Sequence, residues 1–210
     1  MIGKRLRMKM CGMTREQDIA YAAALGVDAI GLIFYPKSPR CVSVKQAKEL
    51  VQNLPAFLNI VAVVVNPSVA SVNEIIKELP IDYLQFHGEE SAEFCTQFKK
   101  PYIKAVQAIS KDFITSMCIE HSQAAAILLD TPSSVHGGTG KVFDWSIIPD
   151  DIKTPLILAG GLNAENVVNA TKKHLLYAVD VCSGIESSPG IKDYDKMNQF
   201  VSALWGSKYE

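Results

Sequence analysis

The chain has 210 residues, 48% of them hydrophobic, and a formal net charge of −1 at pH 7. This length fits one domain with a buried core, and the near-neutral charge excludes the basic footprint of a nucleic-acid-binding domain. No apolar stretch approaches the roughly 18 residues that a membrane helix needs. The five cysteines form no C-x-x-C pair, which argues against a disulfide framework or structural zinc and favours a reducing cytoplasm.

Eight apolar runs predict buried strands, and segments with helical spacing lie between most of them. In chain order, the strands are expected near residues 7–11, 28–33, 60–65, 82–86, 102–106, 125–129, 155–159 and 177–181. The helices are expected at residues 15–25, 44–54, 69–79, 91–98, 111–120, 164–172 and 192–205. Capping-box patterns at 14–17 and 43–46 predict the starts of the first two helices. Residues 60–65 are continuous and β-branched, as expected of a strand covered on both faces.

Regular alternation of strand and helix, with no break in composition, predicts a closed parallel (β/α)8 barrel over residues 1–210 as a single catalytic domain. A doubly wound open sheet is the alternative. It is disfavoured because no G-x-G-x-x-G sequence follows the first strand. Barrel enzymes place their chemistry at the carboxyl ends of the strands, so side chains at those positions are the candidates for function.

Two glycine turns follow the last two predicted strands. Gly160 and Gly161 lead into a helix that we expect Asn163 to cap, and Ser183 and Gly184 follow the eighth strand. Glycines allow backbone N–H groups to approach a ligand closely, and paired turns on the last two strands are typical of barrel phosphate sites. The chain is therefore expected to bind a phosphorylated small molecule.

Cys11 and Asp130 end the first and sixth predicted strands. A free cysteine is usually a small buried hydrophobe, and an aspartate after a strand is often a cap or loop partner. At strand ends, Cys11 can instead act as a nucleophile or general base, and Asp130 as a general acid or base. Facing each other across the mouth, the two would suit proton transfers at two atoms of one sugar.

Four further residues are candidate substrate contacts. Arg40, in a proline-framed loop, can clamp a carboxylate or lie solvated on the surface. Asp180 can bond a sugar hydroxyl or brace its loop, and His87 can be a ligand or a braced loop residue. Gly138 lies in the glycine-rich segment 137–141, which is either a lid or an ordinary turn. Cys182 is interpreted as packing, and no metal site is visible.

At these residues the sequence resembles the phosphoribosylanthranilate isomerase family. The resemblance is carried, in the family's order, by residues 9–12, 34–40, 85–88, 129–131 with 137–141, 159–162 and 180–186, and extends through 189–193. Each motif is weak alone, but the ordered set is specific. Cys182 departs from the pattern, because the family commonly has serine there.

The resemblance implies an Amadori rearrangement of N-(5'-phosphoribosyl)anthranilate in tryptophan biosynthesis, without cofactor or metal, by a monomer or homodimer. It implies that Asp130 is the general acid that opens the ribose ring. Cys11 would be the general base that removes the C2′ proton, and Arg40 would hold the anthranilate carboxylate. The phosphate would be cradled by the four residues Gly160, Gly161, Ser183 and Gly184.

Other barrel functions remain as alternatives. A histidine-pathway isomerase performs the same chemistry, but that family has aspartate where this chain has Cys11. Indole-glycerol-phosphate synthase needs lysines in the mouth, and Lys9 lies two residues before Cys11 on the same strand face. A pentose-phosphate epimerase would need clustered metal ligands. A catalytically silent phosphate-binding barrel is disfavoured by the presence of both candidate catalytic residues.

Overall fold

The computed structural model describes residues 5–132, 142–172 and 174–206, and in it eight parallel strands close into a barrel. The strands are β1 (Arg7–Cys11), β2 (Ala29–Ile33), β3 (Asn59–Val64), β4 (Tyr83–Phe86), β5 (Tyr102–Gln107), β6 (Ala126–Asp130), β7 (Leu156–Leu158) and β8 (Ala178–Val181). They pair in sequence order, and β1 pairs with β8 to complete the ring. The predicted closed barrel is confirmed, and the doubly wound open sheet is wrong.

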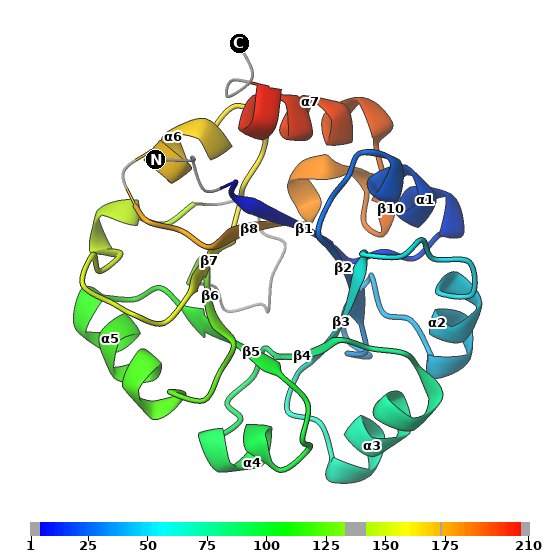
Figure 1. The fold of residues 1–210 in the computed structure, drawn as a ribbon, viewed down its shortest axis with the longest axis horizontal. Coiled ribbons are helices and arrows are strands. Elements are labelled where there is room, and N and C mark those ends of the chain that lie inside the picture. The colour runs from blue at the N-terminus through cyan, green and yellow to red at the C-terminus, as the bar shows by residue number, and fades with distance from the viewer. Residues whose placement is uncertain (1–4, 133–141, 173, 207–210) are drawn as a thin grey trace.

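Helices surround the ring of strands (Figure 1). They are α1 (Glu16–Ala24), α2 (Val44–Leu50), α3 (Val69–Glu78), α4 (Ala92–Thr96), α5 (Lys111–Glu120), α6 (Val167–Lys172) and α7 (Tyr194–Trp205). Between β6 and β7, the described residues form only the short 3-10 helix η1 (Trp145–Ile147). After β8 come the 3-10 helix η2 (Ser183–Ile185) and an antiparallel hairpin of β9 (Glu186–Ser188) and β10 (Ile191–Lys192). None of the described helices is both long and apolar enough to cross a bilayer.

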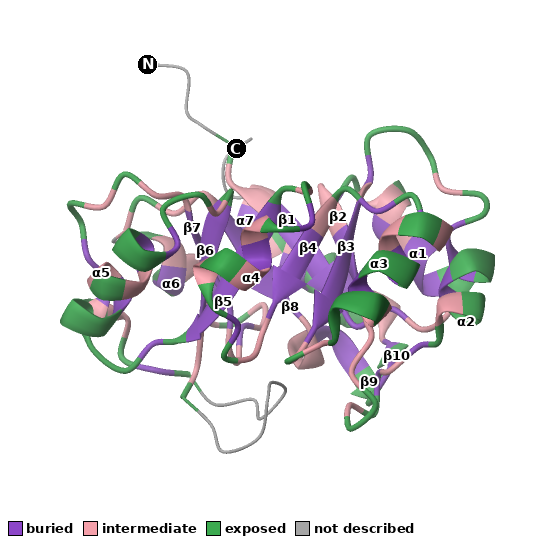
Figure 2. Cartoon of the chain, turned by 90° about the horizontal axis from the view of Figure 1, so that it is seen from below, coloured by how far each residue is buried: buried purple, intermediate pink, exposed green. Residues whose placement is uncertain are grey.

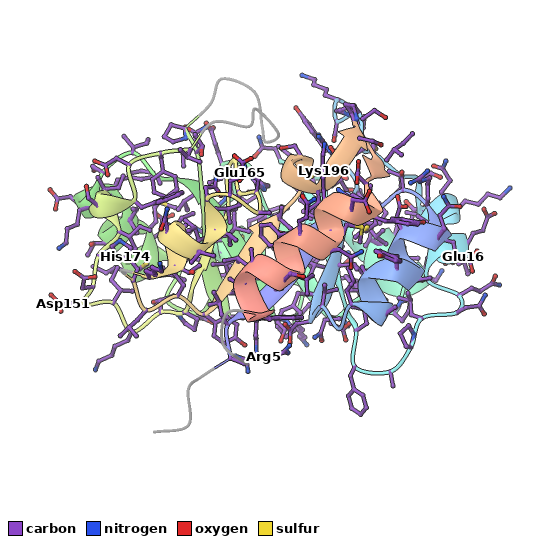
Figure 3. The ribbon with its side chains drawn as sticks, turned by 90° about the horizontal axis from the view of Figure 1, so that it is seen from above. Arg5, Glu16, Asp151, Glu165, His174 and Lys196 are labelled. Atoms are coloured by element: carbon purple, nitrogen blue, oxygen red, sulfur yellow. The ribbon has the colours of Figure 1, made fainter. Side chains whose placement is uncertain are left out.

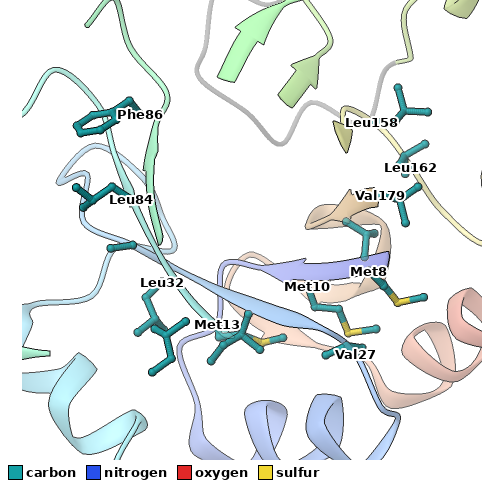
Figure 4. Close-up of a cluster of buried hydrophobic side chains, with 14 of the residues drawn as sticks. Met8, Met10, Met13, Val27, Leu32, Leu84, Phe86, Leu158, Leu162 and Val179 are labelled. Atoms are coloured by element: carbon teal, nitrogen blue, oxygen red, sulfur yellow. The ribbon is translucent and has the colours of Figure 1, made fainter. Parts of the chain in front are cut away.

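Alternation along each strand separates two apolar layers. On β3, Ile60, Ala62 and Val64 join the layer between the barrel and the helices, whereas Val61 and Val63 join the barrel interior. Figure 4 shows part of the outer layer, including Met8 and Met10 of β1. Both faces of β3 are buried, as its continuous β-branched sequence predicts. The burial map accordingly shows buried strands at the centre and exposed residues on the outer helix faces (Figure 2).

The two predicted capping boxes have different outcomes. Ser43 accepts a hydrogen bond from the Gln46 backbone while the Gln46 side chain bonds back, so the box at α2 is confirmed. The box at Thr14 is wrong: α1 begins after Arg15 with no side-chain cap, and the Thr14 hydroxyl donates to the Gly190 carbonyl instead. The Thr14 hydroxyl therefore makes a tertiary contact with the hairpin and does not form the helix cap that the local pattern had predicted.

Helix α7 contacts both the segment that follows β8 and the segment that precedes β1. Near its start, Lys196 Nζ donates to the Glu186 carbonyl over 2.7 Å. At its end, Trp205 Nε1 donates to the Leu6 carbonyl over 3.0 Å, and the Arg5 guanidinium lies over the Trp205 ring. Figure 3 shows Lys196 and Arg5 at opposite ends of this helix. The helix starts two residues later than predicted because Ile191 and Lys192 form β10.

Candidate active site

A cavity of about 90 Å³ lies in the barrel mouth at the carboxyl ends of the strands. Of the predicted site residues, its lining includes Cys11, Arg40, His87, Asp130, Gly160, Gly161, Asp180 and Ser183. A second cavity, of about 400 Å³, lies beside β4 to β6 and shares His87 and Asp130 with the first. The predicted contact Gly138, and the segment 137–141 around it, lie outside the described residues.

Cys11 ends β1 with its side chain in the barrel interior, where it is 6% exposed. A hydrogen bond from the Cys182 thiol is the main cause that holds the pKa of Cys11 well below its usual range. The Lys9 ammonium adds its charge and a hydrogen bond, and together these effects outweigh the burial that opposes ionisation. The structure therefore favours a thiolate at Cys11, the form in which a cysteine accepts a proton.

Lys9 and Asp180 form a buried ion pair beside this sulfur, with 2.8 Å between Nζ and Oδ2. The two residues are register partners on β1 and β8, so their side chains point into the same interior. Burial raises the pKa of Asp180 to about 7, although the Lys9 charge opposes the shift. Among the described residues, Oδ1 of Asp180 has no hydrogen-bond partner. A buried acceptor on the cavity wall is thus available for a ligand hydroxyl.

Asp130 ends β6 and faces His87, which follows β4. Asp130 Oδ2 lies 3.1 Å from His87 Nε2, and Oδ1 accepts from the Thr131 amide over 2.8 Å. His87 Nδ1 lies 3.2 Å from the Gln85 amide nitrogen. An amide nitrogen only donates, so in this arrangement His87 carries its proton on Nε2 and donates it to Asp130. Gln85 and His87 share this position because residues two apart on a strand face the same side.

A second buried ion pair braces the strand end that carries His87. Lys104 Nζ lies 2.9 Å from Glu90 Oε2 and donates to the Gly88 carbonyl over 2.6 Å. Glu90 also accepts from the backbone amides of Asn66 and Gly88. These contacts come from the helix side of the barrel. They fix the loop backbone directly after His87 and so limit where the imidazole can lie.

Arg40 lies on the cavity wall rather than in solvent, with 8% of its surface exposed. Its Nε and Nη2 bind the two carboxylate oxygens of Glu186 over 2.8 and 2.6 Å. Lys192 Nζ lies 2.9 Å from Glu186 Oε1. Because Glu186 occupies the Nε edge, a substrate carboxylate would have to meet the other edge of the guanidinium.

The two glycine turns form the remaining wall. Gly160 and Gly161 have φ values of +78° and +67°, which side-chain-bearing residues rarely adopt. A methyl group at Gly184 would overlap the Leu162 carbonyl oxygen, so only glycine lets these turns approach each other. Asn163 Oδ1 accepts from the amides of Glu165 and Asn166, which confirms its capping role, although α6 begins at Val167. The chain is thus shaped to present backbone amides beside the cavity.

Four residues of the site were not assigned to it from the sequence. Gln85 could have been found from its two-residue spacing to His87. The hairpin brings Glu186 to Arg40 and Lys192 to Glu186, and no local pattern predicted these contacts. Cys182 was interpreted as packing, but it lines the cavity and is the main cause of the lowered pKa of Cys11. Among the described residues, no group of three or more potential metal ligands is found.

The chain is similar throughout to known proteins of one kind. Residues 8–203 match the family model described as N-(5'phosphoribosyl)anthranilate (PRA) isomerase. A relative from Legionella pneumophila strain Lens, named N-(5'-phosphoribosyl)anthranilate isomerase, is 58% identical over 96% of this chain and 98% of its own. A phosphoribosyl anthranilate isomerase structure from Thermotoga maritima is 35% identical, with a TM-score of 0.86 over 96% of this chain and 99% of that one. Another structure, of the isomerase with reduced 1-(o-carboxyphenylamino)-1-deoxyribulose 5-phosphate, is 33% identical with a TM-score of 0.81 over the same shares.

Proposed function

Because the chain belongs to the N-(5'-phosphoribosyl)anthranilate isomerase family, we propose that its barrel mouth performs an Amadori rearrangement with Asp130 as acid and Cys11 as base. The protein is an isomerase of tryptophan biosynthesis. The observation that carries the proposed roles is that Cys11 and Asp130 line one cavity and that each has polar partners beside it. We further infer that residues 1–210 act as one catalytic domain.

The reaction needs a proton given at one atom and removed at another. Asp130 gives a proton to the ribose ring oxygen, the C1′–oxygen bond breaks, and the anthranilate nitrogen forms a Schiff base with C1′. The Cys11 thiolate then takes the proton from C2′, which gives an enolamine that tautomerises to the ketone. One acid and one base are sufficient for this transfer. The low pKa of Cys11 supports its half of the assignment.

Substrate binding follows from the cavity wall. We infer that the phosphate binds at the amides of Gly160, Gly161, Ser183 and Gly184. The positive φ angles of Gly160 and Gly161 open that turn to an anion. The anthranilate carboxylate is placed at the free edge of Arg40. The sugar hydroxyls are placed at Asp180, whose Oδ1 lacks a partner among the described residues, and at His87, with Gly138 as a further contact. Phosphate binding supplies energy for positioning the reacting carbons.

All of the described groups come from one chain. The proposed reaction therefore needs no side chain from a second copy, whether the protein is a monomer or a homodimer.

The test is turnover of freshly generated N-(5'-phosphoribosyl)anthranilate, followed by loss of its fluorescence. Cys11→Ser and Asp130→Asn should each lower kcat by about 10²-fold or more while remaining folded. Cys41→Ser and Asp112→Asn, which change the same residue types outside the cavity, should retain activity. An inactive wild type would favour a phosphate-binding barrel without catalysis. Active variants would show that the roles of Cys11 and Asp130 are wrong.

A further inference from the structure

Cys11 and Cys182 lie at the ends of two neighbouring strands. The β1–β8 register pairs Met10 with Val181, so one further step places Cys11 beside Cys182. Neighbouring strands are about 4.8 Å apart, which falls within the Cα separation of about 4.4–6.8 Å that disulfides span. Cys182 Sγ would lie 3.0 Å from a methyl group built on Gly12, the residue after Cys11. The backbone therefore needs little movement to join the two sulfurs.

The two cysteines lie side by side and are reachable from the mouth. Each affects the pKa of the other, which lowers that of Cys11 and raises that of Cys182, and both residues line the cavity. The charges of Lys9 and Lys192 also act on Cys11. A low-pKa sulfur beside a second cysteine, with access for a small molecule, has the features of an oxidation-sensitive thiol pair.

The remaining three cysteines lack this environment. Cys95 and Cys118 are buried in the layer between the barrel and the helices, and burial raises the pKa of Cys95 to about 12. Burial also raises the pKa of Cys118 and of the half-buried Cys41. Oxidation should therefore begin at Cys11.

We propose that a hydroperoxide converts Cys11 and Cys182 into an intramolecular disulfide that reversibly inactivates the protein. Formation of the bond follows from the geometry alone, and only its effect on activity rests on the proposed function. The two cysteines would then form an oxidative modification site where β1 and β8 close the barrel.

The chemistry balances with the hydroperoxide as the sole oxidant. The Cys11 thiolate attacks one peroxide oxygen, the O–O bond breaks, and Cys11 becomes a sulfenic acid while hydroxide, or an alkoxide, leaves. The Cys182 sulfur then attacks the Cys11 sulfur, the S–O bond breaks, and water leaves with the Cys182 proton. One peroxide is consumed and the two thiols are oxidised to one disulfide. A dithiol reverses the step by exchange.

Cys182 has a protective consequence in this scheme. A sulfenic acid that meets no second thiol is oxidised by a second peroxide to sulfinic acid, which simple thiols do not reduce. With Cys182 beside it, the Cys11 sulfur is captured at the first stage. The proton-accepting thiolate disappears in the disulfide but returns when the bond is reduced.

The experiment treats the native protein with one equivalent of hydrogen peroxide and then blocks free thiols by alkylation. Intact mass should fall by two hydrogen atoms before alkylation, and digestion without reductant should yield the peptides of Cys11 and Cys182 as one linked species. Turnover should be lost with the same time course and should recover with dithiothreitol. Cys41→Ser should behave as wild type.

In Cys182→Ser the linked species should be absent. Excess peroxide should add two oxygen atoms to Cys11 to give a sulfinic acid, and dithiothreitol should then not restore turnover. The proposal is overturned if treated wild type shows Cys11 oxygenated with Cys182 still free, or both thiols unchanged. Should wild type prove inactive as an isomerase, the mass and peptide results still decide the disulfide. The two proposals can therefore fail separately.

Discussion

His87 Nε2 lies 3.1 Å from Asp130 Oδ2, and this pair joins the ends of β4 and β6 across the barrel mouth. The Gln85 side-chain amide orients the His87 ring, because its nitrogen lies 3.2 Å from His87 Nδ1. An amide can also turn and present its oxygen. Gln85 then accepts from His87 Nδ1, and His87 Nε2 accepts from a protonated Asp130. The same three side chains can thus support Asp130 before and after it gives up its proton.

Gln85→Leu should therefore lower kcat by about 10- to 100-fold, the range typical of partners that orient functional histidines, with little change in KM. The measurement is steady-state turnover across pH, because a lost tautomer partner should also change the shape of the pH profile. Gln97→Leu, at an exposed position, is the matched control. An equal rise in KM with kcat unchanged would indicate that Gln85 serves binding and not Asp130.

Lys9→Met should destabilise the protein by about 3–5 kcal/mol at pH 8, because it leaves Asp180 buried without its partner. The folded pKa of Asp180, already raised to about 7 from 3.8, should rise further without the Lys9 charge. A raised carboxyl pKa means that the folded state keeps a proton that the unfolded state has lost. The destabilisation should thus grow as the pH rises above about 7.

Urea unfolding between pH 5 and 9 measures this effect. Lys45→Met, at an exposed position on α2, should change the free energy of unfolding little. The double variant Lys9→Met with Asp180→Leu should recover part of the loss, because it contains no unpaired charge. A loss that is the same at every pH would show that packing, rather than the charge of Asp180, is responsible.

Glu186→Gln should lower the free energy of unfolding most near neutral pH and least in acid. Hydrogen bonds from Arg40 and Lys192 hold the pKa of Glu186 below its usual range against the opposing effect of burial. Its contribution is thus complete above the unfolded value of 4.5 and is lost as the pH falls through the lower folded pKa. The variant should lose about 3–5 kcal/mol at pH 7 and show a shallower fall below pH 4.5.

The free energy of unfolding from urea titrations at pH 3 to 7 provides the comparison, with Glu16→Gln on exposed α1 as control. If wild type and Glu186→Gln respond identically to acid, Glu186 is not a source of the acid sensitivity.

Gly184→Ala should weaken the phosphate turn. Its methyl group would overlap the Leu162 carbonyl, and the resulting shift should cost about 1–3 kcal/mol and move the turn amides. The inhibition constant of inorganic phosphate should rise along with KM. Gly206→Ala is the control, because the nearest atom to its new methyl group would be 4.0 Å away. Unchanged phosphate inhibition in a folded Gly184→Ala protein would contradict the placement of the phosphate.

Local sequence patterns predicted the strands and the residues at their ends, but not the contacts across the barrel. The apolar runs predicted the eight strands, and the positions of Cys11, Asp130 and His87 at strand ends predicted that they lie in one mouth. The structure also buries Arg40 against Glu186, 146 positions later, which no local spacing indicates. Thr14 fits a capping box, but a contact with Gly190 in the hairpin prevails. Local patterns thus predict elements and their facing, whereas partners across the barrel depend on closure.

Closure between β1 and β8 also gives the site an order of assembly. A chain emerging from the ribosome presents Lys9 and Cys11 first, but Asp180 and Cys182 only about 170 residues later. Until the last strand is in place, the lysine has no carboxylate and the sulfur has no donor beside it. A nascent chain therefore holds an ordinary thiol, and the reactive one exists only in the finished barrel.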